Sequence, residues 1–154
     1  MNRPNVKVKK LREGAIIPTY GSSYAAGADL YACLDTESVT IAPGETKFIP
    51  TGISLEIPVR YGGFIYARSG IACKRGLAPA NKVGVVDSDY RGEVMVALHN
   101  HSEVEAEIAN EKDARFVANE FAETLVETFG TSKVTFVSIL LTALGLVGIS
   151  FSPN

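Results

Sequence analysis

The chain has 154 residues, 46 % of them hydrophobic and 21 % charged, and its formal net charge is −2 at pH 7. This length and apolar content suit one compact barrel-sized domain with a substantial core. The small negative charge argues against a protein that binds nucleic acid through its overall electrostatic field. Two cysteines, Cys33 and Cys73, lie far apart without metal-type spacing. We therefore expect reduced thiols in a cytoplasmic protein, or in a nuclear one if the cell is eukaryotic.

Short strand-like runs alternate with turn residues over residues 1–108. KFIPTGISLEI at 47–57 and GFIYAR at 63–68 are such runs, and APGET at 42–46 is one of the turns between them. Runs of this length without a helical period predict an all-β barrel or sandwich domain over residues 1–108. The basic cluster KVKK at 7–10 is interpreted as a solvated strand edge.

The pattern changes after residue 108, in the segment 109–154. Asn110 can cap a helix, Val117, Phe121 and Leu125 recur at i+4 spacing, and Gly130 stands where a helix would end. These features predict an amphipathic helix over 110–129.

An apolar stretch follows at 134–151, with 18 consecutive uncharged residues. It is at the lower limit for a membrane-spanning helix, and Ser and Thr dilute it. We favour a buried helix or two buried strands over a membrane anchor. A native, a divergent and a frameshifted or engineered C-terminus are all compatible with so abrupt a change.

Three polar clusters in the first 108 residues contain groups suited to chemistry. One surrounds Asp29, and a second places Arg68, Ser69 and Gly70 at one turn, a combination that suits an anionic oxygen. Taken singly, each has an ordinary structural explanation such as a turn or a surface ion pair. The pair His99 and His101 lacks a third ligand nearby, so we interpret it as exposed strand-end histidines.

The third cluster is KVGVVDSDYRGEV at 82–94. Two apolar runs flank Asp87, Asp89, Tyr90 and Arg91. The runs predict two strands joined by a tight turn. A turn alone does not explain two carboxylates, an aromatic ring and a guanidinium within five residues.

These clusters together resemble the trimeric dUTP diphosphatase (dUTPase) family. The matching motifs are AGADLYA at 26–32, ARSGIA at 67–72 and NKVGVVDSDYRGEV at 81–94, and the resemblance covers residues 3 to about 100. It implies a jelly-roll-like barrel, a homotrimer, and hydrolysis of the small molecule dUTP to dUMP and pyrophosphate.

The resemblance also implies roles for the residues of the third motif. Asn81 would hold the uracil ring, together with backbone groups of Gly84 and Val85. Tyr90 would stack under the deoxyribose and leave no room for a 2′-hydroxyl. Asp87 would orient the water that attacks the α-phosphate, and Arg91 would steady the turn or a subunit contact rather than bind the substrate.

For the first two motifs, the resemblance implies contacts with the phosphates. Arg68, Ser69 and Gly70 would bind them, and Asp29 would support that cluster. Mg²⁺ would be held by the triphosphate and by water rather than directly by protein ligands.

The family pattern breaks after residue 100. The fourth motif of the family is usually similar to GDRIAQ. The equivalent stretch in this chain is NEKDARFVANEF at 110–121, and the whole chain lacks Gln. The fifth motif is a glycine-rich arm similar to GGFGSTG, and only the short stretch FGTS at 129–132 resembles it. The alternative to an active enzyme is therefore an impaired homologue that binds deoxyuridine nucleotides or acts as a regulatory protein.

Overall fold

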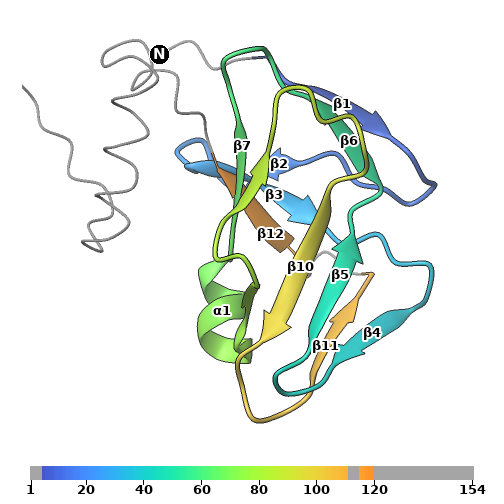
Figure 1. Ribbon diagram of the computed structural model, residues 1–154, viewed down its shortest axis with the longest axis vertical. Helices are drawn as coiled ribbons and strands as arrows, with labels where there is room; N and C mark the ends of the chain where they lie inside the picture. The colour runs from blue at the N-terminus through green and yellow to red at the C-terminus, as the bar shows by residue number, and fades with distance from the viewer. Residues whose placement is uncertain (1–4, 111–114, 120–154) are drawn as a thin grey trace, which may run out of the picture. The chain divides into compact units, whose positions relative to one another are not determined.

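The computed structural model describes residues 5–110 and 115–119 of the chain. These residues form short antiparallel strands and, within the same ranges, one helix (Figure 1). The prediction of a mainly β fold is confirmed.

The strands before the helix are β1 (Lys7–Lys10), β2 (Thr19–Tyr20), β3 (Gly27–Tyr31), β4 (Ser38–Ile41), β5 (Thr46–Pro50), β6 (Ile53–Glu56) and β7 (Gly63–Tyr66). After helix α1 (Ser69–Arg75) follow β8 (Leu77–Pro79), β9 (Gly84–Val86), β10 (Met95–Asn100), β11 (Ala106–Ala109) and β12 (Arg115–Asn119). The turn predicted around Gly70 is thus the start of α1, which ends at Gly76 in the left-handed conformation.

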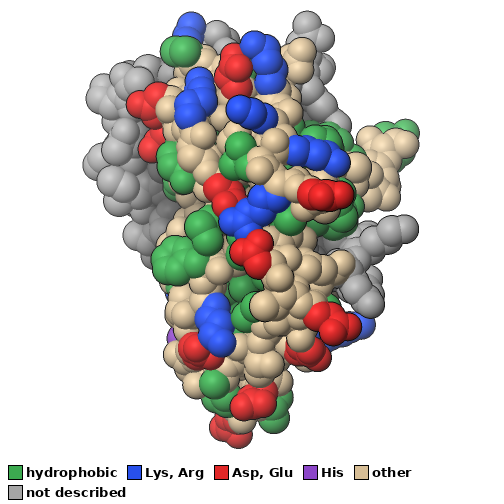
Figure 2. All heavy atoms as spheres, turned by 90° about the vertical axis from the view of Figure 1, so that its right-hand side faces the viewer, with side chains coloured by type: hydrophobic (Ala, Val, Ile, Leu, Met, Phe, Trp, Pro, Cys, Tyr) green, Lys and Arg blue, Asp and Glu red, His purple; other side chains and the backbone are tan. Residues whose placement is uncertain are grey.

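The strands form four antiparallel sheets. The largest has the order β2-β3-β12-β7-β9, and a second has the order β5-β10-β8. Two pairs, β1-β6 and β11-β4, complete the set. As predicted, the basic cluster KVKK is an edge strand, β1, with mostly exposed side chains. On the face that includes β1 and β6, Lys and Arg side chains are interleaved with Asp and Glu (Figure 2).

The helix predicted over 110–129 is wrong at residues 115–119, which form strand β12. This strand pairs with β3 on one side and β7 on the other, with Val117 opposite both Asp29 and Tyr66. Two neighbouring strands offer backbone partners on both sides, and this tertiary pairing overrides a local helical period. The sheet therefore continues past residue 108, the end of the predicted barrel domain. Residues 111–114 and 120–129 lie outside the described residues.

The tight two-stranded hairpin predicted around residues 82–94 is also wrong in one respect. Strands β9 and β10 are both present, but they belong to different sheets: β9 pairs with β7, whereas β10 pairs with β5 and β8. The connection between them is therefore a loop that spans two sheets. We call residues 81–94 the pocket segment.

The core lies between these sheets and is built by alternation along the strands. In β10, Val96, Leu98 and Asn100 are buried, while the residues between them are more exposed. This period of two is the signature of a strand with one face on the core. The most deeply buried apolar side chains come from several strands, namely Leu30, Ile41, Ile49, Ile53, Leu77, Leu98 and Ile108.

Asn100 is the polar exception at the end of β10, and its side chain is completely buried. Its amide nitrogen donates to the carbonyls of Ile41 at 2.9 Å and Val104 at 2.8 Å, and its oxygen accepts from the Ser102 amide at 2.9 Å. The side chain thus joins the strand to the following loop.

We expect Asn100→Ala to lower the free energy of unfolding by about 3 kcal/mol, because each buried group left without a partner costs about 1–3 kcal/mol. Urea unfolding followed by circular dichroism measures the change. Glu105→Ala, at an exposed position nearby, is the control. An effect of Asn100→Ala as small as that of the control would contradict this account.

None of the helices in the described part of the chain is long and apolar enough to cross a membrane. The apolar stretch 134–151 lies outside that part.

Candidate active site

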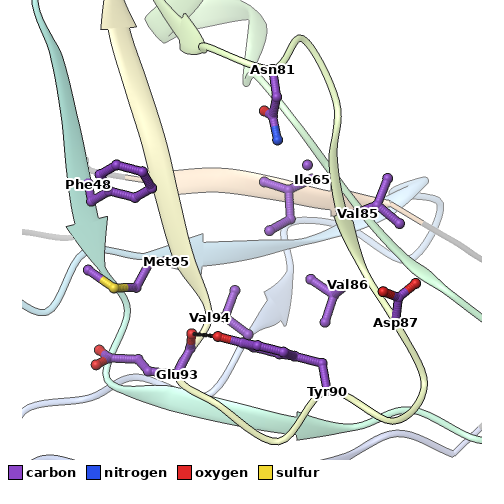
Figure 3. Close-up of a pocket in the computed structure, with 11 residues that line it drawn as sticks. Phe48, Ile65, Asn81, Val85, Val86, Asp87, Tyr90, Glu93, Val94 and Met95 are labelled. Carbon is purple, nitrogen blue, oxygen red and sulfur yellow. Dashed lines mark hydrogen bonds between the residues drawn. The ribbon is translucent and has the colours of Figure 1, made fainter.

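A cavity of about 310 Å³ opens between the pocket segment and strand β5 (Figure 3). Phe48 of β5 and Ile65 of β7 contribute to its lining. The other lining residues belong to the pocket segment and the start of β10, namely Asn81, Gly84, Val85, Val86, Asp87, Tyr90, Glu93, Val94 and Met95. Because β9 and β10 diverge into different sheets, side chains from both can face the space between them. A paired hairpin would have closed this space.

The first arm of the pocket segment lies very close to β7. Gly84 is opposite Ile65 in the ladder, and a β-carbon added at Gly84 would come within 3.2 Å of the Ile65 Cβ. The same added carbon would lie 3.7 Å from the Asn81 amide nitrogen. Glycine therefore lets β9 approach β7 and leaves the Asn81 amide room beside the strand.

The turn of the pocket segment folds the Tyr90 ring back over Gly92. The Tyr90 hydroxyl donates to the Glu93 carbonyl at 2.9 Å (Figure 3). A β-carbon at Gly92 would lie only 2.5 Å from that hydroxyl, so this placement of the ring requires glycine. The Arg91 guanidinium donates to the Ser88 carbonyl at 2.7 Å, which agrees with its predicted part in steadying the turn.

The two carboxylates of the turn differ in position. Asp87 lines the cavity at its rim, and its side chain is open to solvent (Figure 3). Asp89 is also exposed but lies outside the cavity lining of the described residues. A carboxylate at a cavity rim can accept a proton from a bound water molecule.

Asp29, Arg68, Ser69 and Gly70 form a second cluster. The Arg68 Nε lies 3.8 Å from the Asp29 Oδ1, and Asp29 is buried in β3 while Arg68 is 40 % exposed. Ser69 and Gly70 are exposed in the first turn of α1. Within the described chain, these four residues are not part of the cavity lining. One chain therefore presents the predicted site residues as two separate groups.

The sequence profile of the dUTPase family matches residues 13–134 of the chain. The chain belongs to the dUTPase family. The match extends beyond residue 100, where the recognisable motifs end, and includes strand β12. The family resemblance of the three motifs is thereby confirmed.

Curated bacterial dUTPases, named deoxyuridine 5'-triphosphate nucleotidohydrolases, are similar along most of the described chain. The enzyme of Syntrophotalea carbinolica is 46 % identical over 103 residues, which are 67 % of this chain and 69 % of the relative. The enzyme of Desulfitobacterium hafniense strain DCB-2 is 50 % identical over 103 residues, 65 % of this chain and 68 % of the relative.

Solved dUTPase structures share the fold. The dUTPase of Staphylococcus aureus phage phi11 superposes with a TM-score of 0.65 at 21 % identity, covering 74 % of this chain and 88 % of the other. A variant of the Staphylococcus bacteriophage 80alpha dUTPase, solved with dUpNHpp, gives a TM-score of 0.66 at 21 % identity. It covers 74 % of this chain and 80 % of the other.

Several residues around the cavity of this dUTPase were not predicted from the sequence. Phe48 is 68 % exposed and Met95 is 44 % exposed, and both stand on the cavity side of the β5-β10 sheet. A large apolar side chain on the outward face of a strand is the sequence feature that could have indicated them. Ile65 and Glu93 also line the cavity.

The two histidines lie away from the cavity lining of the described residues. Their ring centroids are 4.4 Å apart, and the His99 Nδ1 is hydrogen-bonded to the Thr46 hydroxyl at 2.9 Å. Partial burial, with His99 and Lys82 nearby, lowers the pKa of His101 below its ordinary value. Among the described residues, no third His, Cys, Asp or Glu side chain joins this pair in an arrangement that could hold a metal ion.

Proposed function

We propose that this dUTPase family member hydrolyses dUTP to dUMP and pyrophosphate. The observation that carries the proposal is the cavity itself, because five predicted substrate residues line it together: Asn81, Gly84, Val85, Asp87 and Tyr90. Family membership and the names of the relatives support the same reaction.

The base binds between the first arm of the pocket segment and the apolar wall. The Asn81 amide offers both a donor and an acceptor to the uracil edge, and backbone groups of Gly84 and Val85 add to them. Phe48 and Met95 supply a flat apolar surface on the opposite side. Backbone groups, unlike a side-chain amide, cannot exchange donor and acceptor, so a base with the reversed pattern leaves them unpaired, which disfavours cytosine.

The sugar lies against the ring of Tyr90. The hydrogen bond to the Glu93 carbonyl holds that ring over the turn, and so limits the space on its cavity side. A 2′-hydroxyl has no room there, and this selects deoxyribose over ribose.

Asp87 orients the attacking water. Its carboxylate at the cavity rim accepts a proton as the water oxygen bonds to the α-phosphorus and the bond to the bridging oxygen breaks. Pyrophosphate leaves with the electron pair of the broken bond, dUMP carries the new oxygen, and Asp87 later releases the proton to solvent. Electrostatic stabilisation of the charge that develops on the phosphates completes the catalysis.

Arg68, Ser69 and Gly70 bind the phosphates, and Asp29 holds the Arg68 guanidinium. Because these residues and the cavity are separate in one chain, the complete site requires a neighbouring chain in a homotrimer. The separation supports this assembly, as the family resemblance does. The substrate is a small nucleotide, and the proposal involves neither nucleic acid nor a membrane.

Mg²⁺ fits this site as an ion that the substrate itself coordinates. Among the described residues, no three His, Cys, Asp or Glu side chains are arranged to hold a metal ion. Triphosphate oxygens and water would therefore hold the ion, rather than protein side chains. The ion neutralises part of the triphosphate charge and helps to orient the phosphates.

Pyrophosphate release from dUTP, with dTTP, dCTP and UTP as controls, tests the proposed function. We expect release from dUTP that is selective and that falls when EDTA removes Mg²⁺. The mass of the particle in solution is measured on the same sample, and we expect a trimer. If the folded protein left dUTP intact, the proposed enzymatic function would be contradicted.

The alternative function is binding without turnover. It is favoured because the chain lacks recognisable fourth and fifth family motifs and contains no Gln. This homologue would retain the nucleotide cavity but lack the closing arm. Tight binding of a dUTP analogue without pyrophosphate release from dUTP would support it.

We expect Gly84→Ala to raise the KM for dUTP about tenfold or more, because displacements near 1 Å in a site can cost two orders of magnitude. The new β-carbon would lie 3.2 Å from the Ile65 Cβ and would push β9, with the residues through which it lines the cavity, away from β7. Steady-state kinetics measures the change. Gly62→Ala is the matched control, since its β-carbon would meet neighbours at an ordinary 3.8 Å. Equal KM values for both variants would contradict this role of Gly84.

A further inference from the structure

Glu93 connects the pocket segment to a part of the chain far away in sequence. Its Oε2 accepts from the Arg12 Nη2 at 2.8 Å, and its Oε1 accepts from the Gly52 amide at 2.8 Å. Arg12 also donates through Nη1 to both oxygens of Asp35, at 3.0 and 3.1 Å. The Glu93 side chain is only 18 % exposed, so the pair lies largely below the surface.

The backbone of the same residue holds the tip of Tyr90. The Glu93 carbonyl accepts the Tyr90 hydroxyl at 2.9 Å (Figure 3). The next residue is fixed as well: the Val94 amide donates to the Ile53 carbonyl at 2.9 Å, and its carbonyl accepts the Thr51 hydroxyl at 2.6 Å. The Tyr90 hydroxyl is therefore hydrogen-bonded to a stretch of backbone that other parts of the chain hold in place.

The turn itself is held mainly from its two ends. The β9-β7 ladder anchors the first end. Within the turn the hydrogen bonds are local, from the Tyr90 amide to the Asp87 carbonyl and from Arg91 to Ser88. Glu93 and Val94 anchor the second end, and there Arg12 supplies a charged partner.

We propose that Arg12 and Glu93 are a positioning pair that fixes the Tyr90 ring in the cavity and thereby sets the discrimination between deoxyribose and ribose. The inference rests on the proposed function, because it assigns the sugar to the space beside Tyr90. Although Glu93 lines the cavity, the role assigned to its carboxylate and to the Arg12 guanidinium is indirect: both act through the backbone carbonyl that holds the phenol.

Charge is the physical reason for an ion pair at this position. Hydrogen bonds between charged groups are shorter and stronger than neutral ones, and a guanidinium offers donors in a fixed geometry to two partners. The hydrogen bond that Arg12 donates to Glu93, helped by the charges of Glu93 and Asp35, raises the pKa of Arg12 above its ordinary value despite partial burial. The guanidinium thus stays protonated at any pH at which the enzyme would be assayed.

The test compares kcat/KM for dUTP and UTP in the wild-type protein, in Arg12→Met and in Arg12→Lys. We expect Arg12→Met to lower the dUTP-to-UTP ratio about tenfold, the equivalent of one charge-assisted hydrogen bond. KM for dUTP should rise more than kcat falls, since Asp87 remains in place. Arg12→Lys, which keeps a positive charge, should restore part of the ratio.

Two further variants separate positioning from simple loss of stability. Glu93→Gln keeps an acceptor for the Gly52 amide but removes the charge opposite Arg12, and should lower the ratio as well. Lys7→Met breaks an exposed ion pair between Lys7 and Glu56, 2.8 Å apart on β1 and β6, and should leave the ratio unchanged. All variants are assayed well below their thermal unfolding midpoints. A lowered midpoint with an unchanged ratio in both Arg12→Met and Glu93→Gln would overturn the proposal.

Binding distinguishes failure of this inference from failure of the proposed function. If the wild-type protein does not hydrolyse dUTP, the affinities for dUMP and UMP are measured by calorimetry instead. A wild-type preference for dUMP that falls about tenfold in Arg12→Met would support the positioning pair even without catalysis. A preference that is unchanged in the variant, or absent from the wild-type protein, would overturn it.

Discussion

Asp87→Asn should abolish dUTP hydrolysis and leave nucleotide binding almost intact. We expect kcat to fall by about two to four orders of magnitude, the usual contribution of a positioned acid or base. The amide keeps the size of the carboxylate at the exposed cavity rim, but it cannot accept the proton of the attacking water. Stopped assays of pyrophosphate release give kcat, and calorimetry with a non-hydrolysable dUTP analogue gives the dissociation constant.

Asp89→Asn is the matched control for this experiment. Asp89 lies two residues further along the same turn, is also exposed to solvent, and is not among the described residues that line the cavity. Its substitution changes the net charge by the same amount as Asp87→Asn. Because Asp89 is not part of the described cavity lining, kcat should remain unchanged. Full turnover by Asp87→Asn would show that another group orients the water.

Tyr90→Ala should admit UTP as a substrate. We expect the preference for dUTP over UTP to fall by about one to two orders of magnitude, the range available from shape-based exclusion. The reason is the loss of the ring whose hydroxyl is fixed to the Glu93 carbonyl at 2.9 Å. The measurement is kcat/KM for each nucleotide.

Two other variants separate the ring from its placement. Tyr90→Phe keeps the ring and removes the hydrogen bond, so its preference for dUTP should lie between those of the wild-type protein and Tyr90→Ala. Gly92→Ala should behave like Tyr90→Ala, because its β-carbon would occupy the place of the Tyr90 hydroxyl. If all three variants kept the wild-type preference, the ring would have no part in selecting the sugar.

The residues of the pocket segment could be predicted from the sequence because they are local. Asn81, Asp87 and Tyr90 lie within ten positions of one another, and one turn brings them together whichever sheets the flanking strands join. Their motif also carried the family resemblance. The pairing of the strands was not predicted, because apolar runs on either side of a turn look alike in a closed hairpin and in an open loop between sheets.

The cavity walls depend on contacts between distant parts of the chain. Ile65 reaches the site because β7 pairs with β9, and Phe48 because β5 pairs with β10. Arg12 reaches Glu93 across 81 positions. The register between strands that are distant in sequence is set when the core assembles. It therefore cannot be predicted from the local pattern of a single sequence.

Strand β12 is a second case in which distant contacts, rather than the local sequence pattern, decide the structure. Its local pattern has the spacing of an amphipathic helix, yet residues 115–119 pair with both β3 and β7. Propensity and period are weak determinants where a sheet offers hydrogen-bond partners on both sides of a segment. The family profile, which extends to residue 134, includes this strand.

Hydrolysis of dUTP in water enriched with heavy oxygen tests the central claim most directly. The account predicts that the protein releases pyrophosphate and that mass spectrometry finds the label in the phosphate of dUMP, because water attacks the α-phosphorus. Label in pyrophosphate instead would contradict the role given to Asp87. Unreacted dUTP after incubation with folded protein and Mg²⁺ would contradict the enzyme itself.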